Sequence, residues 1–152
     1  VGDLLPHFSL PNQNNKIRKN DDYQGKWMVL YVYPRDDTPG CTLEGIGFSS
    51  KKGDFERLNA VVIGLSDDDV PAHESFCNKH KLSVELLADP QAKLLKELGI
   101  EQKEYKGKFY YNRTTLIMND KGAIRYIYND MSPEGHEKEV LVRLQKLQED
   151  NY

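Results

Sequence analysis

The chain of 152 residues has a formal net charge of −3 and a pI near 5.8, which gives no support for a nucleic-acid-binding protein, since such a protein needs a clustered basic face. Its length favours one domain, residues 1–152, with enough residues to bury a substantial core. No apolar stretch is long enough to cross a bilayer, and the first residues lack the basic and apolar regions of a signal peptide, so we expect no membrane span.

Cysteine usage narrows the cellular setting. The chain has two cysteines, Cys41 and Cys77, which are too few for the disulfide framework of a small secreted protein. Redox chemistry in the cytoplasm fits this count better. We therefore expect a cytoplasmic protein.

The first 26 residues are predicted to form an extended piece around Phe8, a polar turn at residues 12–16 and an approach to the next strand at residues 22–26. Residues 27–33 follow as an uninterrupted run of apolar and aromatic side chains, which is typical of a fully buried strand. Prolines and a glycine between residues 34 and 40 then end this strand and allow a helix to begin.

Cys41 falls in the first turn of that predicted helix. Amide N–H groups at a helix start have no intrahelical partners, and with the positive end of the helix dipole they favour an anion. A thiolate in this position is stabilised over the thiol, so we expect the pKa of Cys41 to be lowered. A cysteine is more often a small buried apolar residue than a nucleophile. The strand-to-helix junction, where α/β proteins place ligand sites, nevertheless favours a catalytic role for Cys41.

The rest of the chain alternates strands and helices. The predicted elements are, in order, a helix at 41–58, a strand at 60–66, a helix at 72–80, a short strand at 86–88, a helix at 91–98 ended by Gly99, an exposed loop or hairpin at 101–112, strands at 114–118 and 123–128 joined by a hairpin turn, and a last helix at 133–148. This order predicts an α/β fold with a central mixed sheet flanked by helices on both faces.

Gly45 and Gly47 lie in the N-terminal half of the first predicted helix, where each glycine costs roughly 1 kcal/mol relative to alanine. Two interpretations stay open. The glycines could allow another segment to pack closely against the helix, or they could let this end of the helix unwind during a reaction.

The Pro-x-x-x-Thr-x-x-Cys signature of peroxiredoxins is matched by Pro34, Thr38 and Cys41. The longer stretch, with Glu44 three residues after the cysteine, resembles the bacterioferritin comigratory protein (PrxQ-type) subfamily. The similarity extends over nearly the whole chain. It implies a thioredoxin-like fold with the N-terminal hairpin typical of peroxiredoxins.

The resemblance also implies roles for the motif residues. Cys41 would be the peroxidatic thiolate, which attacks a peroxide oxygen and becomes a sulfenic acid. Thr38 would orient substrate and thiolate through its hydroxyl, which can donate and accept at once. Pro34 would pack over the cysteine and limit water, while the backbone N–H groups of Gly40 and Cys41 would bind the peroxide.

Arg113 comes directly before a predicted strand, and residues 113–117 are similar to the Arg-x-Thr-Phe-Leu-Ile pattern of the family. Taken alone, it is an ordinary surface charge. At the site, its guanidinium would lower the pKa of Cys41 further and polarise the O–O bond of the substrate. Glu44 could hold this arginine by carboxylate pairing, or it could equally be an acid on the helix surface.

Cys77 departs from the commonest subfamily pattern, in which a resolving cysteine follows the peroxidatic one by five residues. Ile46 occupies that position here. A smaller group of relatives carries the resolving cysteine on the helix after the next strand, and Cys77 lies there, 36 residues after Cys41 (77 − 41 = 36). We favour a resolving role for Cys77 over a passive thiol, because sulfenic acids condense with accessible thiols.

His73, Cys77 and His80 would share one face of their helix, and histidine and cysteine are zinc ligands. Three candidates on one short helix do not match the usual paired spacings, so we expect no metal and no cofactor. A protonated imidazole could instead favour a Cys77 thiolate. His7 and His136 are expected to be structural or exposed.

Together these features predict a thiol peroxidase that reduces hydrogen peroxide and organic hydroperoxides, forms a Cys41–Cys77 disulfide and is recycled by thioredoxin or a similar dithiol, most simply as a monomer. One alternative is a one-cysteine peroxidase with an inert Cys77. Another is a thiol-based redox sensor or binding module that passes its oxidation to a partner. A disulfide oxidoreductase is disfavoured because the chain has no Cys-x-x-Cys.

Overall fold

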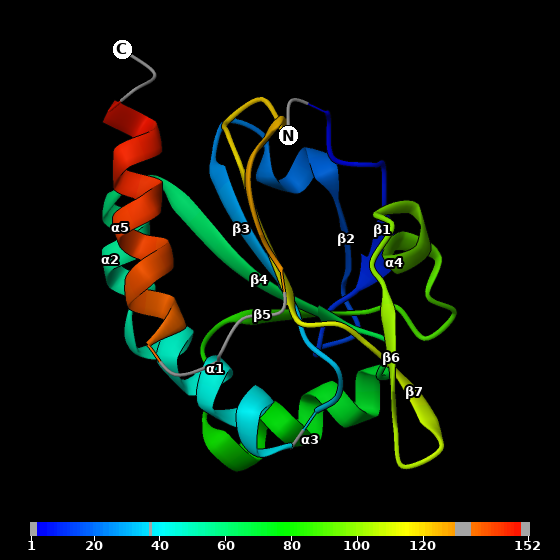
Figure 1. The fold of residues 1–152 in the computed structure, drawn as a ribbon. Helices are drawn as coiled ribbons and strands as arrows, with labels where there is room; N and C mark the ends of the chain where they lie inside the picture. The colour runs from blue at the N-terminus through cyan, green and yellow to red at the C-terminus, as the bar shows by residue number, and fades with distance from the viewer. Residues whose placement is uncertain (1–2, 37, 130–134, 150–152) are drawn as a thin grey trace.

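The computed structural model describes residues 3–36, 38–129 and 135–149. At its centre is a five-stranded sheet with the strand order β5-β4-β3-β8-β9 (Figure 1). The strands are β3 (Trp27–Val32), β4 (Ala60–Ser66), β5 (Glu85–Ala88), β8 (Thr114–Met118) and β9 (Ile124–Asn129). β3, β4 and β5 run parallel, whereas β8 is antiparallel to both β3 and β9, so the predicted mixed sheet is confirmed.

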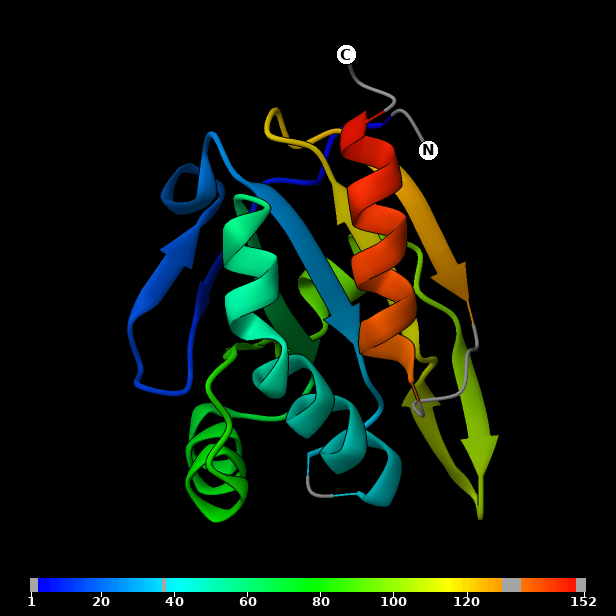
Figure 2. The same ribbon diagram turned by 90° about the vertical axis from the view of Figure 1, so that its left-hand side faces the viewer.

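Helices cover the sheet on both sides. Figure 2 shows α1 (Pro39–Ser50), α2 (Lys52–Arg57) and α5 (His136–Glu149) along one face. The short α4 (Lys93–Glu97) lies on the other side, as does the 3-10 helix η1 (Asn20–Tyr23). The helix α3 (Val70–His80) lies at the same end of the sheet as the start of α1 (Figure 1).

The central strand β3 joins two hydrophobic cores, because alternate side chains of a strand point to opposite faces. One set lies in the core beneath α1, α2 and α5 and consists of Trp27, Val29 and Tyr31. The other lies in the core that includes α4 and η1 and consists of Met28, Leu30 and Val32. All six are buried, as predicted for an uninterrupted apolar run.

The N-terminal hairpin predicted from the family resemblance is present as β1 (Ser9–Pro11) paired with β2 (Ile17–Lys19). It covers the edge strand β5 through a backbone bridge between Asn12 and Leu87. Glu85 of β5 fixes the hairpin, because one of its carboxylate oxygens accepts from Asn12 at 2.8 Å and the other from the Tyr23 hydroxyl. An edge strand covered in this way is protected from pairing with another chain.

Two predicted helices differ from the structure. The helix expected at 41–58 is broken at Lys51, where the Ser50 hydroxyl bonds back to the Gly47 carbonyl at 2.7 Å and the backbone leaves the helical path. The helix expected at 91–98 begins only at Lys93, because Ala92 has a φ of 56° and Asp89 caps the helix start. The expected start of the last helix at residue 133 lies outside the described residues.

Residues 101–112 were predicted as an exposed loop or a hairpin. They form a hairpin of β6 (Gln102–Tyr105) and β7 (Lys108–Tyr111). The strand register then explains why distant segments meet. Val32, the last residue of β3, pairs with Thr114, the first residue of β8. The residue before β8, Arg113, is therefore placed beside the loop that leads from β3 into α1.

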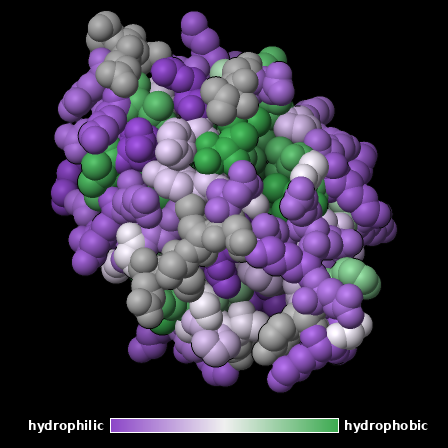
Figure 3. Space-filling model, in the orientation of Figure 1, coloured by the Kyte–Doolittle hydropathy of each residue, from purple (hydrophilic) through white to green (hydrophobic). Residues whose placement is uncertain are grey.

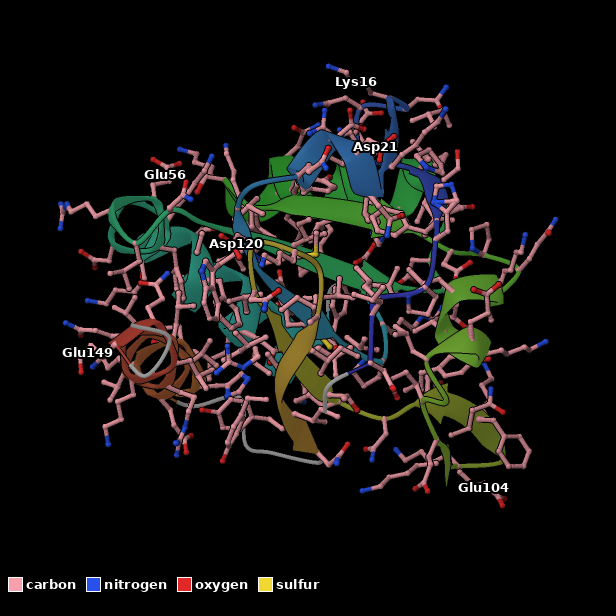
Figure 4. The ribbon with its side chains drawn as sticks, turned by 90° about the horizontal axis from the view of Figure 1, so that it is seen from above. Lys16, Asp21, Glu56, Glu104, Asp120 and Glu149 are labelled. Atoms are coloured by element: carbon pink, nitrogen blue, oxygen red, sulfur yellow. The ribbon has the colours of Figure 1, made fainter. Side chains whose placement is uncertain are left out.

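Charged side chains occupy the outside of the molecule. Figure 4 labels six of these exposed residues: Lys16, Asp21, Glu56, Glu104, Asp120 and Glu149. The face in Figure 3 is mainly hydrophilic, with its most extensive apolar area toward the upper right. Among the described residues, no helix combines the length and apolar character that crossing a membrane requires. Glu44 is an exception, because it is fully buried although charged side chains are usually exposed.

Candidate active site

The start of α1 presents free backbone amides next to Cys41. Thr38 is the N-cap, Pro39 is the first helical residue, and the first i to i−4 hydrogen bond runs from the amide of Thr42 to the carbonyl of Thr38 at 2.8 Å. The amides of Gly40 and Cys41 precede this bond and have no intrahelical partner. The predicted place of Cys41 in the first turn is confirmed.

Arg113 connects Cys41 with Glu44. Its Nη1 lies 3.7 Å from the Cys41 sulfur and 3.0 Å from Glu44 Oε1. Cys41 is 1% exposed and Glu44 is fully buried, so the guanidinium contacts both groups away from bulk water. Of the two interpretations of Glu44, pairing with Arg113 is confirmed. The hydrogen bond to the Glu44 carboxylate fixes the orientation of the Arg113 guanidinium.

The pKa of Cys41 differs from the sequence-based expectation. Burial raises it above its ordinary value, while the positive charge of Arg113, the Thr38 hydroxyl and the Arg35 backbone lower it. The prediction of a lowered Cys41 pKa is wrong for this structure, because desolvation disfavours the thiolate. The depth at which Cys41 is buried could not be read from the sequence. Arg113 and the donors offset part of that cost.

Replacing Arg113 with alanine should raise the pKa of Cys41 further, because a positive charge 3.7 Å from the sulfur is lost from a desolvated site. Oxidation of Cys41 by peroxide should slow accordingly below that pKa. The pH dependence of thiolate absorbance and of single-turnover oxidation would measure both effects. Arg57→Ala is the matched control, since this arginine is exposed and pairs with Asp54 on its own helix. An unchanged pH profile in Arg113→Ala would place Arg113 outside the site.

Burial raises the pKa of Glu44 to about 7, and Arg113 opposes this shift. Because the folded state favours the protonated carboxyl, Glu44 contributes most to stability below its ordinary pKa of about 4.5. This contribution falls as the pH rises through about 7. We expect a loss on the order of 2–3 kcal/mol across this range.

Glu44→Gln should remove that loss while keeping an oxygen for Arg113. His136 acts with the opposite sign, because burial lowers its pKa to about 4 and its protonation at acidic pH destabilises the folded state. The informative quantity is therefore the wild-type free energy of unfolding minus that of Glu44→Gln, measured in urea at pH 5 and pH 8. Glu56→Gln, at an exposed position, is the control. A difference that does not change with pH would show that Glu44 does not titrate in this range.

A pocket of about 760 Å³ opens beside this site. Pro34, Thr38, Gly40 and Arg113 line it, so the pocket brings together four residues singled out in the sequence. The Thr38 hydroxyl donates to the Arg35 carbonyl at 3.0 Å. The same hydroxyl lowers the pKa of Cys41 when its hydrogen turns to the nearby sulfur instead of to Arg35.

Tyr110 and Tyr111 of β7 also line this pocket and were not predicted from the sequence. The tyrosine-rich character of residues 101–112 was visible, but no local pattern indicates that this hairpin turns back over a loop some 70 residues earlier. Tyr33 and Asp36 were likewise not singled out, although both belong to the motif segment.

Cys77 is not brought into this pocket. It is a free thiol within α3 and 8% exposed, and burial raises its pKa to about 11, with the charge of Asp36 adding to the shift. It reaches the surface at a separate depression lined by Gln13 and Asn14 of the N-terminal hairpin. The idea that a nearby imidazole favours a Cys77 thiolate is therefore not supported.

The segments around the two cysteines do contact each other, in one place through Gly45. A Cβ atom added at Gly45 would lie 3.1 Å from Leu82 Cδ1, just beyond the end of α3. At Gly47 it would lie 2.6 Å from the Glu137 carboxylate. Close packing is thus one use of both glycines. Ease of unwinding stays a prediction.

The three residues considered for zinc do not form a group. In the part of the chain that the structure describes, the potential ligand cluster consists of Asp36, Asp68 and His73 and omits Cys77 and His80. His80 packs edge-on against Phe76. As expected, His136 is structural, buried beside Thr115 with 2.7 Å between the two side chains, and His7 is exposed.

Comparisons with known proteins agree with this geometry. The chain matches the AhpC/TSA family over residues 1–127. It is 37% identical over 150 residues to a protein named peroxiredoxin bcp of Coxiella burnetii, covering 95% of this chain and 97% of that protein. It is 36% identical over 147 residues to the chloroplastic peroxiredoxin Q of Triticum aestivum, covering 96% of this chain and 67% of that protein.

Solved structures give the same result. A cysteine-to-serine mutant of Xylella fastidiosa PrxQ has a TM-score of 0.92 and 33% identity, covering 97% of this chain and 96% of that one. The bacterioferritin comigratory protein of Xanthomonas campestris has a TM-score of 0.86 and 27% identity, covering 91% and 90%. The chain therefore belongs to the AhpC/TSA family, as a thiol peroxidase of the peroxiredoxin bcp/Q group with a thioredoxin-like fold.

Proposed function

We propose that Cys41 is the peroxidatic residue. The observation that carries this assignment is the Arg113 guanidinium, 3.7 Å from the Cys41 sulfur at the free amides of a helix start. The Cys41 thiolate attacks one peroxide oxygen and the O–O bond breaks. The other oxygen leaves with a proton as water or an alcohol, and Cys41 becomes a sulfenic acid. Arg113 and the amides of Gly40 and Cys41 stabilise the charge that moves onto the leaving oxygen.

Pro34, Thr38 and the pocket beside them define the substrate class in this proposal. Hydrogen peroxide fits any such opening, and the tyrosine wall at Tyr110 and Tyr111 provides apolar surface for the organic group of a hydroperoxide. The Xanthomonas campestris relative is described by its alkyl peroxide reduction activity. We therefore include organic hydroperoxides among the substrates.

Cys77 is proposed as the resolving residue. Its thiol attacks the Cys41 sulfenic acid, which releases water and forms an intramolecular disulfide. Solved structures of Xanthomonas campestris peroxiredoxin Q include cysteine-to-serine mutants at two positions whose numbers differ by 36, as those of Cys41 and Cys77 do. Because a disulfide needs Cα atoms roughly 4.4–6.8 Å apart, we propose that the first turn of α1, the end of α3 or both unwind before the bond forms.

The proposed reductant is thioredoxin or a similar dithiol protein, and the proposed setting is a cytoplasmic monomer. Steady consumption of hydrogen peroxide with thioredoxin, thioredoxin reductase and NADPH tests the function. We expect many turnovers per protein. A single turnover that then stops, with the oxidation passed to another protein, would instead support the redox sensor.

A further inference from the structure

Three buried polar side chains form a cluster between the loop after β3 and α3. His73 is fully buried, and its Nδ1 lies 2.6 Å from Asp36 Oδ2. The Tyr33 hydroxyl donates to the other carboxylate oxygen of Asp36 at 2.6 Å. On the far side of the ring, His73 Nε2 lies 2.9 Å from the Leu87 carbonyl. Tyr33 and His73 have no role in the proposed peroxide chemistry, whereas Asp36 also lines the pocket proposed for the substrate.

The geometry makes this a strong connection. A backbone carbonyl only accepts, so Nε2 of His73 carries a hydrogen directed at Leu87. Nδ1 and the Asp36 carboxylate, 2.6 Å apart, form a second hydrogen bond. Both ring nitrogens of His73 are thereby occupied, which favours this hydrogen-bonded pair over a metal site at Asp36, Asp68 and His73. Breaking one such buried contact leaves a polar group without a partner.

The cluster joins the segments that carry the two cysteines. Asp36 belongs to the loop that leads into α1, five residues before Cys41. Its backbone amide is also held, by Asp68 Oδ2 at 2.8 Å. His73 lies one helical turn before Cys77 on the same face of α3. A movement of α3 away from the Cys41 loop must therefore break the contact between Asp36 and His73.

We propose that Asp36, His73 and Tyr33 form a latch that sets how long the Cys41 sulfenic acid persists before Cys77 attacks it. This inference rests on the proposed resolving role of Cys77. While the latch is closed, a second peroxide can transfer an oxygen to the sulfenic acid, which gives a sulfinic acid and releases water or an alcohol. When it opens, the Cys77 sulfur bonds to the Cys41 sulfur, the S–O bond breaks, and the hydroxyl leaves with the Cys77 proton as water. His73 and Tyr33 are positioning residues in this scheme.

The latch is tested with a mild variant, Tyr33→Phe, and a more disruptive one, His73→Gln. Loss of the Tyr33 hydroxyl removes one hydrogen bond to a carboxylate and should speed disulfide formation by about threefold. His73→Gln should speed it by about tenfold or more. The sulfinic acid fraction at high peroxide should fall in the same order. The rate of the first Cys41 oxidation should change by less than about twofold, since neither side chain lines the pocket.

The measurement is rapid mixing of the reduced protein with hydrogen peroxide, followed by thiol blocking and mass spectrometry of the Cys41 and Cys77 peptides at each time. Arg57→Ala is a control, because it also removes a side-chain bond to a carboxylate, that of Asp54, but at an exposed position of α2. It should leave both rates and the sulfinic acid fraction unchanged. Circular dichroism checks that each variant is folded, and Tyr33→Phe keeps the test informative where His73→Gln does not fold.

The outcomes separate the two proposals. A wild-type protein that forms no Cys41–Cys77 disulfide would contradict the resolving role itself and the latch with it. A wild-type protein that forms the disulfide, together with a folded Tyr33→Phe variant that forms it no faster, would overturn the latch alone. Slower disulfide formation in that variant would also overturn it, because the cluster would then assist the attack instead of delaying it.

Discussion

Replacing Cys41 with serine should reduce peroxidase activity by roughly 10⁴-fold or more, because a serine hydroxyl is far too weakly acidic to supply the attacking anion. The change is nearly isosteric at a residue that is 1% exposed, so the fold and the contact between Arg113 and Glu44 should persist. What is lost is the sulfur at the centre of the site. No other group along the pocket, Thr38 included, can become a sulfenic acid.

The experiment follows hydrogen peroxide consumption in a single turnover, without any reductant, so that recycling plays no part. The wild type should consume one equivalent of peroxide at the first step and Cys41→Ser none. Cys77→Ser is the matched control, because it removes the other thiol by the same chemical change. Substantial peroxide consumption by Cys41→Ser would overturn the assignment of the peroxidatic residue.

Replacing Cys77 with serine should separate the first step from the cycle. Oxidation of Cys41 should proceed at the wild-type rate within about twofold, since Cys77 lies outside the pocket. Steady turnover with thioredoxin should fall by roughly 100-fold or more, because no intramolecular disulfide can form. The Cys41 sulfenic acid should instead accumulate and, with excess peroxide, proceed to the sulfinic acid.

A sulfenic-acid-specific reagent followed by mass spectrometry would detect the accumulating species at Cys41. The one-cysteine alternative predicts a different result, in which Cys77→Ser turns over with the same reductant as fast as the wild type. That outcome would show Cys77 to be inert. Ile46→Ser, at an exposed position of α1, is a control that introduces a serine without removing a thiol.

Much of the site could be predicted from the sequence because its residues lie in one short motif. A turn that starts a helix after a buried strand leaves little freedom for Thr38, Gly40 and Cys41, and the structure places them as expected. Arg113 was found only through the similarity of its neighbouring residues to a family pattern. The place of Arg113 beside Cys41 follows from the pairing of Val32 with Thr114 in the sheet. No local pattern in the sequence reveals this pairing.

The errors have a common origin in burial and tertiary packing. The pKa of Cys41 was expected to fall because the helix start and the arginine were visible, whereas the desolvation that raises it depends on the whole fold. His73 was considered as a metal ligand or as an imidazole acting on Cys77, because helical spacing relates it to Cys77 and not to Asp36. The contact between His73 and Asp36 depends on how α3 packs against the loop after β3.

The mass of the oxidised wild-type protein tests the central claim most directly. Reduced protein is treated with one equivalent of hydrogen peroxide, free thiols are blocked, and the intact protein and its peptides are analysed without reductant. We predict a monomeric mass lower by two hydrogens and a peptide pair that joins Cys41 to Cys77. An oxidised Cys41 alongside an unmodified, blockable Cys77, or an unoxidised Cys41, would contradict the account.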